Sequence, residues 1–273
     1  MYADAVARIT ESIFPIFYIE PQGGLVGVCG TGFFVDKSGL FLTAEHIMAA
    51  APPGSTMYYY GKAPDDICEP AVEIEHVASE PAHDLYLGRV SRDYLPPVEV
   101  SDQAVRPGDS VCLSGYPMAM LSISPEGALV GNVRRYWQPT FVIDATQALI
   151  EGRTYDGYIV QDPCLSGMSG GPVFDMEGTV RGMAAANLTR TIPELGESPT
   201  IVRNGIVSAA EHILRFLEHT ALDRPEPEGD HQPADGSSFH PFRQSREIVC
   251  TFPPDADPSA APRRPSGQDL IDP

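Results

Sequence analysis

A serine set among glycines is the residue of this sequence best suited to chemistry. Ser169 lies in the run Gly-Met-Ser-Gly-Gly-Pro that extends from Gly167 to Pro172. A serine hydroxyl attacks a carbonyl when a base removes its proton and nearby donors stabilise the oxyanion that forms. The small neighbours allow backbone N–H groups and a substrate carbonyl to come close. The run therefore predicts acyl transfer, and it requires a histidine and a carboxylate from elsewhere in the chain.

Two other interpretations of this run are open. It fits the Gly-x-Ser-x-Gly nucleophile elbow of α/β-hydrolases, and it fits a glycine-rich turn with a solvated serine. An elbow is followed directly by a helix, whereas residues 172–183 have the pattern of a strand, a turn and a second strand. An α/β-hydrolase also needs its base downstream of the serine, and the candidates there are His212, His219, His231 and His240.

His46 is the candidate base upstream of the serine. It follows two short apolar runs, 30–36 and 40–44, which predict strands joined by a turn at 37–39. A histidine at the end of a buried hairpin is held firmly, and imidazole exchanges its proton near neutral pH. A short helical stretch is expected from His46 to about Pro52. The alternative is a histidine that merely packs at a helix start.

Asp84 is the candidate acid. It precedes an apolar strand that runs to Val90. A carboxylate in this place can accept a hydrogen bond from the imidazole, fix its tautomer and stabilise the imidazolium. The alternative is an ordinary turn residue before a strand. His83 is a second candidate base, but neighbouring strand residues point to opposite faces, so we do not expect His83 and Asp84 to face one another.

The order of His46, Asp84 and Ser169, with the local sequence around each, resembles the trypsin-like (chymotrypsin-fold) serine proteases. The stretch 31–46 is most similar to the bacterial HtrA-like and glutamyl-endopeptidase branches, and the resemblance covers residues 10–220. It implies that Ser169 is the nucleophile, that His46 is the general base and that Asp84 orients His46. The sequence has no C-x-x-C and no His/Cys cluster with zinc spacing, so we expect neither a metal ion nor a cofactor.

The same resemblance implies an oxyanion hole and a specificity pocket. The hole would be formed by the backbone N–H groups of Gly167 and Ser169. The pocket floor would lie six residues before the nucleophile, where no carboxylate stands, so a preference for Arg or Lys is not expected. The residues that would line this pocket are Pro163, Ala185, Ala186 and Asn187.

Two departures from the family pattern carry expectations of their own. Trypsin has an acidic residue directly before its serine, which pairs with a freed N-terminus on activation, whereas this chain has Met168. We therefore expect no trypsin-style activation. HtrA-like proteases usually carry a PDZ domain after the protease, and the stretch after the last predicted helix is too short for an additional one.

The expected fold is all-β, with two antiparallel six-stranded β-barrels and the site in the cleft between them. A polar, proline-containing stretch at 93–107 is expected to link the barrels. The sequence Ser208-Ala-Ala-Glu211 has a capping-box pattern that predicts a C-terminal helix to about Thr220. The expected division is a short helix at 1–12, a first barrel at 13–100, a second barrel with the helix at 101–221, and a disordered acidic, proline-rich tail at 222–273.

Composition limits the partners and the location. The net charge of −19 argues against nucleic acid and against anionic membrane surfaces as partners. No apolar run is long enough for a transmembrane helix, and the first residues lack the basic start of a signal peptide. The five cysteines are odd in number and irregularly spaced, which is typical of reduced thiols. These features predict a cytoplasmic protein.

Three functions are compatible with these residues. The first is a serine endopeptidase that acts on proteins or peptides, with a dedicated target or an activating partner protein. The second is a restrained or inactive binding module with a protease fold. The third is an α/β-hydrolase-type esterase, which requires one of the downstream histidines.

Overall fold

A computed structural model describes residues 2–20, 26–59, 72–91, 96–117, 119–123, 129–192 and 200–222. The tail predicted at 222–273 lies outside the described residues except for Leu222, which ends the last helix. In chain order the elements are α1 (Ala3–Ile9), η1 (Thr10–Ser12), β1 (Ile13–Ile19), β2 (Val26–Phe34), β3 (Leu40–Ala44), α2 (Glu45–Ala49), β4 (Thr56–Tyr59), β5 (Val72–Glu73), β6 (Glu75–Glu80), η2 (Pro81–His83), β7 (Leu85–Arg89), β8 (Ser110–Gly115), β9 (Met120–Ile123), β10 (Leu129–Asn132), β11 (Tyr136–Ile150), β12 (Arg153–Val160), β13 (Pro172–Phe174), β14 (Val180–Ile192), β15 (Thr200–Ala209) and α3 (Ala210–Leu222).

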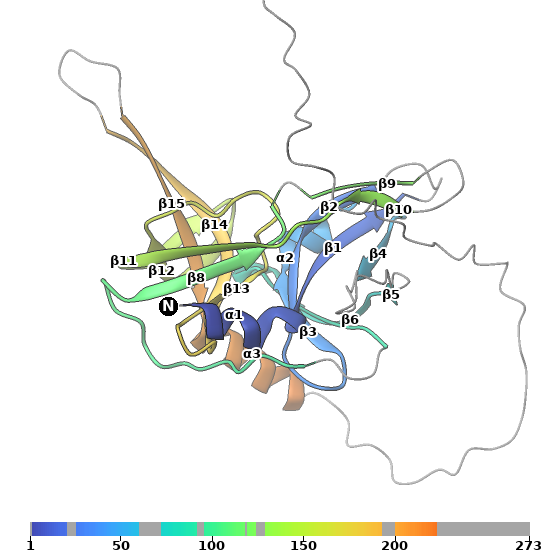
Figure 1. Cartoon of the computed structure of the whole chain (residues 1–273), viewed down its shortest axis with the longest axis horizontal. Helices are drawn as coiled ribbons and strands as arrows, with labels where there is room; N and C mark the ends of the chain where they lie inside the picture. The colour runs from blue at the N-terminus through green and yellow to red at the C-terminus, as the bar shows by residue number, and fades with distance from the viewer. Residues whose placement is uncertain are drawn as a thin grey trace, which may run out of the picture.

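The strands form two large antiparallel sheets side by side, and β9 and β10 form a separate two-stranded ribbon (Figure 1). The second sheet is a closed barrel with the order β11-β12-β15-β14-β13-β8. The first has the order β5-β4-β1-β2-β3-β7-β6. The predicted all-β, chymotrypsin-like fold with a C-terminal helix is confirmed. In the described residues the first sheet has seven strands, and its two outer strands, β5 and β6, follow each other in the chain with only Ile74 between them. The Ile74 N–H donates to Met57 O of β4 at 3.0 Å, so one continuous stretch, residues 72–80, pairs with β4 at its start and with β7 along the rest.

The core of the first sheet fixes the strand that leads to the candidate base. All residues of β3 are buried, and the Phe41 ring lies edge-on to Phe14 with 5.1 Å between the ring centroids. The Phe34 ring lies 4.5 Å from Phe14 on the same centroid measure. Aromatic pairs at such separations add about 0.5–1.5 kcal/mol beyond the area that they bury. The end of β3 is therefore rigid, and α2 with His46 follows it directly.

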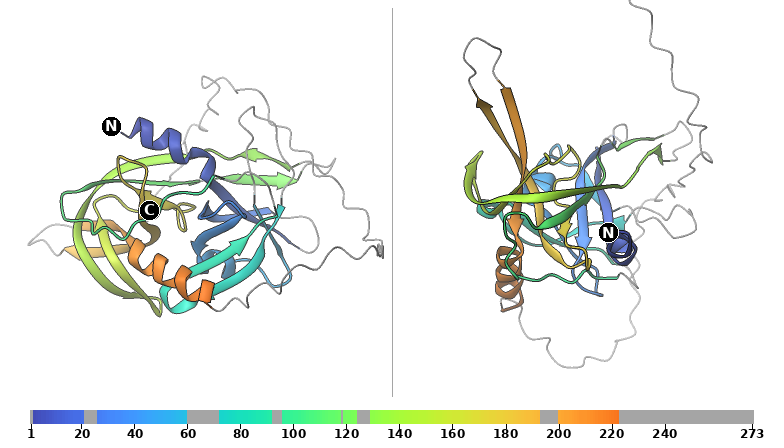
Figure 2. Two further views of the ribbon diagram at one scale, coloured as in Figure 1. Left: turned by 90° about the horizontal axis from the view of Figure 1, so that it is seen from below. Right: turned by 60° about the vertical axis from the view of Figure 1, so that its left-hand side comes forward.

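The terminal helices pack on the outside of the barrels (Figure 2). Helix α1 precedes the first sheet in sequence but contacts the second, because the Tyr2 hydroxyl is 2.9 Å from Ser110 Oγ and its ring lies edge-on to Phe174. Helix α3 buries Ile213 and Phe216 in the same hydrophobic core that contains Phe34 and Phe41. No helix in the described part of the chain is long and apolar enough to cross a bilayer.

The predicted capping box before α3 is wrong. Ser208 belongs to β15 and is buried, and its hydroxyl has no hydrogen-bond partner among the described residues. Strand β15 continues through Ala209 because Ser208 pairs with Gly157 of β12 and with Met183 of β14. The ladder on both sides holds Ser208 in the sheet, so its side chain is not available to cap the helix.

Candidate active site

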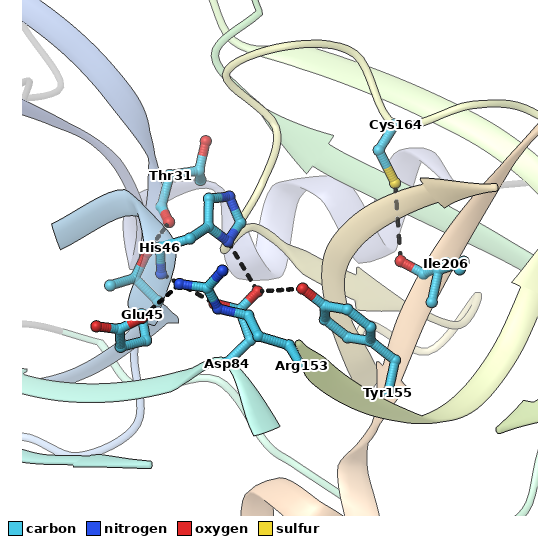
Figure 3. A network of polar contacts seen from close by, with 9 residues as sticks. Thr31, Glu45, His46, Asp84, Arg153, Tyr155, Cys164 and Ile206 are labelled. Carbon is cyan, nitrogen blue, oxygen red and sulfur yellow. Dashed lines mark hydrogen bonds and ion pairs between the residues drawn. The ribbon is translucent and has the colours of Figure 1, made fainter. Parts of the chain in front are cut away.

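His46 lies on α2 and faces the carboxylate of Asp84 (Figure 3). His46 Nδ1 is 2.7 Å from Asp84 Oδ2, and the His46 backbone N–H donates to Asp84 Oδ1 at 2.9 Å. The Asp84 side chain has no exposed surface, whereas 31% of the His46 side chain is exposed. A carboxylate can only accept from Nδ1–H, so the partner assigns the tautomer and leaves Nε2 as the acceptor. This nitrogen is the one that can take a proton from a nucleophile.

Asp84 holds this place through an unusual backbone conformation. Its φ of 58° and ψ of 38° are left-handed, a region that Asp enters more readily than most residues. The turn follows η2 and lets the Asp84 carbonyl accept the Glu45 N–H at 3.1 Å. Together with the bond to the His46 N–H, it satisfies two backbone donors at the start of α2, which would otherwise lack partners. One residue thus fixes both the helix and the ring that the helix carries.

Two residues that the sequence analysis missed complete the surroundings of Asp84. The Tyr155 hydroxyl donates to Asp84 Oδ2 at 3.0 Å, and Arg153 Nε lies 3.5 Å from Asp84 Oδ1. The Arg153 guanidinium also pairs with Glu45 Oε2 at 2.9 Å. Both side chains come from β12, across the boundary between the sheets (Figure 3). The available sequence signal was their spacing, since residues i and i+2 share one face of a strand.

The loop that carries Ser169 is fastened to the first sheet. The Ser169 carbonyl accepts the Thr31 N–H at 3.0 Å, and Gly170 donates to Ala184 O at 2.7 Å. Gly170 lies against Thr43 and against the backbone N of Ala44, two residues before His46. The structure thus brings the serine loop to the end of the strand that leads into α2. In the described part of the chain, no hydrogen bond joins the Ser169 hydroxyl to His46.

The two backbone donors predicted for the oxyanion hole lie in the same loop. Gly167 has a φ of 95°, and its carbonyl accepts from Thr31 Oγ1 at 2.7 Å and from the Tyr116 N–H at 3.4 Å. These bonds point the Gly167 carbonyl toward Thr31 and Tyr116. Within the described residues, neither the Gly167 N–H nor the Ser169 N–H donates to another protein group. Both are therefore available to a negative oxygen.

Met168, between these two donors, is buried in the second barrel. Its side chain has no exposed surface and packs with Leu113, Val142 and Val173. Its N–H closes a turn with Leu165 O at 2.9 Å. A thioether in an apolar core needs no charged partner, so packing rather than an ion pair holds this side of the loop.

The four residues predicted for the specificity pocket fall in two segments that touch. Asn187 Oδ1 accepts the Cys164 N–H at 2.8 Å, and Asn187 Nδ2 donates to Cys164 O at 2.8 Å. Both polar atoms of the Asn187 side chain therefore bond to the backbone of Cys164, the residue after Pro163. Ala185 is buried, and Ala186 is partly buried beside it. Two cavities of about 180 and 190 Å³ lie apart from these residues, around Arg181.

The alternative bases lie away from the serine loop. His83 Nδ1 pairs with Glu80 Oε1 at 2.7 Å, and its ring stacks on His212 with 5.8 Å between the centroids. His212 lies 3.5 Å from Asp156 Oδ2 on the outside of the second barrel. His219 belongs to the same helix, α3. The other two downstream candidates, His231 and His240, lie outside the described residues.

A comparison with known families agrees with this geometry. Residues 30–183 match the trypsin-like peptidase domain. The chain belongs to this family. An uncharacterised protein of Sinorhizobium fredii, y4bJ, is 29% identical to this chain over 170 residues, which make up 62% of this chain and 23% of that protein. A probable periplasmic DegP-like serine endoprotease of Marinomonas is 25% identical over 195 residues, which make up 71% of this chain and 37% of the relative. This chain thus spans well under half the length of these relatives.

Solved structures show the same fold. The HtrA-type protease AlgW with a decapeptide superposes on this chain with a TM-score of 0.61 at 16% identity, covering 82% of this chain and 68% of AlgW. The active form of the Rv3671c protease from M. tuberculosis has a TM-score of 0.59 at 21% identity, covering 82% of this chain and 86% of the other. The expected resemblance to HtrA-like protease domains is confirmed.

The predicted cytoplasmic location is wrong. The DegP-like relatives from Marinomonas and from two Pseudomonas species are probable periplasmic enzymes, which points away from the cytoplasm. The prediction depended partly on cysteines without a disulfide pattern. In this chain, burial raises the pKa of the Cys112 and Cys164 thiols to about 12. Such thiols stay protonated and unreactive, so they carry no information about the redox state of a compartment.

Proposed function

We propose that the chain is a serine endopeptidase in which Ser169 is the nucleophile, His46 the general base and Asp84 the residue that orients the base. The observation that carries the proposal is the 2.7 Å contact between His46 Nδ1 and a fully buried Asp84 carboxylate. It is supported by the hydrogen bond between Thr31 and Ser169, which fastens the serine loop to the strand next to the one that leads into α2. Membership of the trypsin-like peptidase family supports the same chemistry.

The proposed reaction forms and breaks an acyl-enzyme. His46 Nε2 takes the Ser169 hydroxyl proton while the oxygen attacks the peptide carbonyl, and the resulting imidazolium is stabilised by Asp84. The oxyanion is held by the N–H groups of Gly167 and Ser169. Removing one such donor typically costs about 10²–10³ in rate. His46 then gives its proton to the leaving amine, and a water activated by the same nitrogen hydrolyses the ester.

The proposed substrate is a protein or peptide with a small or apolar residue before the scissile bond. This follows from the pocket segments, where Pro163 replaces a charged floor and the Asn187 amide is occupied by Cys164. The structure of the HtrA-type protease AlgW with a decapeptide supports a peptide as ligand. Profiling with a peptide library checks the preference, and a profile dominated by Arg or Lys contradicts it.

A restrained enzyme that a dedicated target or an activating protein switches on is the second candidate. The observation that favours it is the missing hydrogen bond between Ser169 and His46 in the described residues. Such bonds often tighten when substrate binds, so the gap is also compatible with an enzyme that is active by itself.

Fluorophosphonate labelling separates these functions. We expect the wild-type chain to be labelled, Ser169→Ala and His46→Ala to lose the label, and His212→Ala to keep it as the matched histidine control. Labelling that appears only after a peptide or protein is added supports the restrained enzyme. Loss of labelling in His212→Ala, with retention in His46→Ala, contradicts the assigned base. No labelling under any condition favours a binding module.

A further inference from the structure

Two side chains on one face of β12 reach the candidate acid from the opposite barrel. Arg153 and Tyr155 are two residues apart, so their side chains project in the same direction from the strand. The Tyr155 ring is 4% exposed and packs with Ala185 and Ile206. This packing fixes the direction of the hydroxyl, whose oxygen is 3.0 Å from Asp84 Oδ2.

The Asp84 carboxylate needs donors because it is sealed from water. A buried carboxylate is costly unless it is hydrogen-bonded or paired with a cation. Asp84 Oδ1 has the His46 N–H and the nearby Arg153 guanidinium, and Oδ2 has the His46 ring and the Tyr155 hydroxyl. Oδ2 is thus held by two hydrogen bonds, and Oδ1 by one hydrogen bond and by an ion pair in which Arg153 Nε makes no hydrogen bond. The carboxylate can neither rotate nor move away from the imidazole without losing a partner.

Tyr155 acts only as a donor in this arrangement. Burial and the neighbouring Asp84 charge raise the pKa of the Tyr155 phenol above its ordinary value. The hydroxyl therefore keeps its proton throughout the working pH range. Arg153 keeps its charge as well, because the hydrogen bond to Glu45 raises the pKa of the guanidinium.

We propose that Tyr155 is a positioning residue for the catalytic acid, and that Arg153 assists it by tying β12 to both Glu45 and Asp84. The inference rests on the proposed function, in which Asp84 orients His46. Because Tyr155 shares Asp84 Oδ2 with the His46 ring, its loss changes the proton that lies between His46 and Asp84. This makes the second barrel a direct contributor to a histidine–aspartate pair that belongs to the first sheet.

The test compares Tyr155→Phe with Tyr158→Phe. Tyr158 is a matched control because it is buried on the same strand and its hydroxyl has no partner among the described residues. We expect Tyr155→Phe to lower kcat by about tenfold, the usual order for a lost bond to a charged group, with KM changed less than about twofold. The control should leave both constants close to wild type. Arg153→Lys keeps the charge and should fall between the two.

A spectroscopic readout makes the test independent of turnover. The proton in the His46–Asp84 bond gives a proton NMR resonance far downfield of the amide protons. Tyr155→Phe should move it further downfield, because Oδ2 becomes a better acceptor when its second donor is removed, and Tyr158→Phe should not move it. An unmoved resonance in Tyr155→Phe overturns the inference, even if kcat falls. If the wild type neither labels nor turns over, the proposed function fails and the resonance alone decides the positioning role.

Discussion

Gly170 occupies a position next to Ser169 that has no room for a side chain. Its φ is 80°, and a Cβ there would meet the Thr43 hydroxyl, the Thr31 carbonyl and the Ala44 amide nitrogen. Two of these are backbone atoms, which cannot move aside as the end of a flexible side chain can. Gly108 also has a positive φ, of 94°, but a Cβ there meets nothing within 4 Å. Alanine substitutions at Gly170 and Gly108 therefore distinguish the cost of a left-handed backbone from the cost of a steric clash.

We expect Gly170→Ala to lower the free energy of unfolding by about 3 kcal/mol or more, because about 1–2 kcal/mol of left-handed strain adds to overpacking of about 1–3 kcal/mol. Gly108→Ala carries only the strain. Urea denaturation measures both values, and fluorophosphonate labelling measures the effect on Ser169. Equal losses of stability in the two variants would show that the crowding around Gly170 is relieved by movement of the loop.

At the scale of elements, the loop between β12 and β13 depends on β2. Thr31 makes two contacts with this loop: its N–H donates to Ser169 O at 3.0 Å, and its hydroxyl donates to Gly167 O at 2.7 Å. The same hydroxyl accepts the N–H of Tyr116, directly after β8, at 3.1 Å. The Thr31 hydroxyl therefore fixes the direction of the Gly167 carbonyl. The first sheet thus shapes a loop that belongs to the second barrel.

Thr31→Val tests this dependence, since valine keeps the shape and removes the hydroxyl. We expect kcat/KM for a peptide substrate to fall by about tenfold or more, because the Gly167 N–H loses its fixed direction and one oxyanion donor is worth about 10²–10³. Thr220→Val is the control, because its hydroxyl donates to Phe216 O within α3. A full rate in Thr31→Val would mean that the loop keeps its conformation without this hydroxyl.

At the scale of the whole molecule, the stretch predicted as a linker at 93–107 forms hydrogen bonds with both sheets. Val98 donates to Phe34 O at 2.9 Å in the first sheet, and Ser101 donates to Val180 O at 3.1 Å in the second barrel. Val100 also forms a parallel bridge with Val180. Helix α1 and the contacts of Asp84 with β12 join the two halves again. We therefore expect them to unfold together.

Alkaline pH should destabilise the fold through the two buried thiols of the second barrel. The pKa of each, at Cys112 and Cys164, is raised in the fold from about 9 to about 12. The unfolded chain loses these protons above pH 9 while the folded chain keeps them, so stability falls as the pH rises from 9 to 12. Each thiol contributes a slope of about 1.4 kcal/mol per pH unit at most.

Thermal unfolding at pH 8 and pH 10.5 measures this loss. The Cys112→Ala, Cys164→Ala double variant should start from a lower Tm at pH 8 but lose less between the two values. If wild type and variant lose the same amount, other groups dominate the alkaline transition.

The sequence predicted those candidate site residues that can be recognised from the residues on either side of them. Ser169, His46 and Asp84 each stand in a short context of turns and strands, and the structure brings His46 and Asp84 into contact. The sequence analysis did not identify Tyr155 and Arg153 as neighbours of Asp84. Their contacts with Asp84 depend on how the two sheets pack together, and no local sequence pattern predicts that packing. Ser208 was wrongly predicted to cap α3. The sequence of a helix cap and that of a strand end can be the same, and only the strand partners Gly157 and Met183 distinguish them.

The complete burial of Asp84 also bears on how the proposed activity responds to ionic strength. Dissolved ions screen charges that solvent reaches, over about 8 Å at physiological salt, but they cannot enter the space around a carboxylate with no exposed surface. The net charge of −19, in contrast, acts on approaching peptides through the solvent. Added salt should therefore weaken the capture of basic peptides and leave the chemical step untouched.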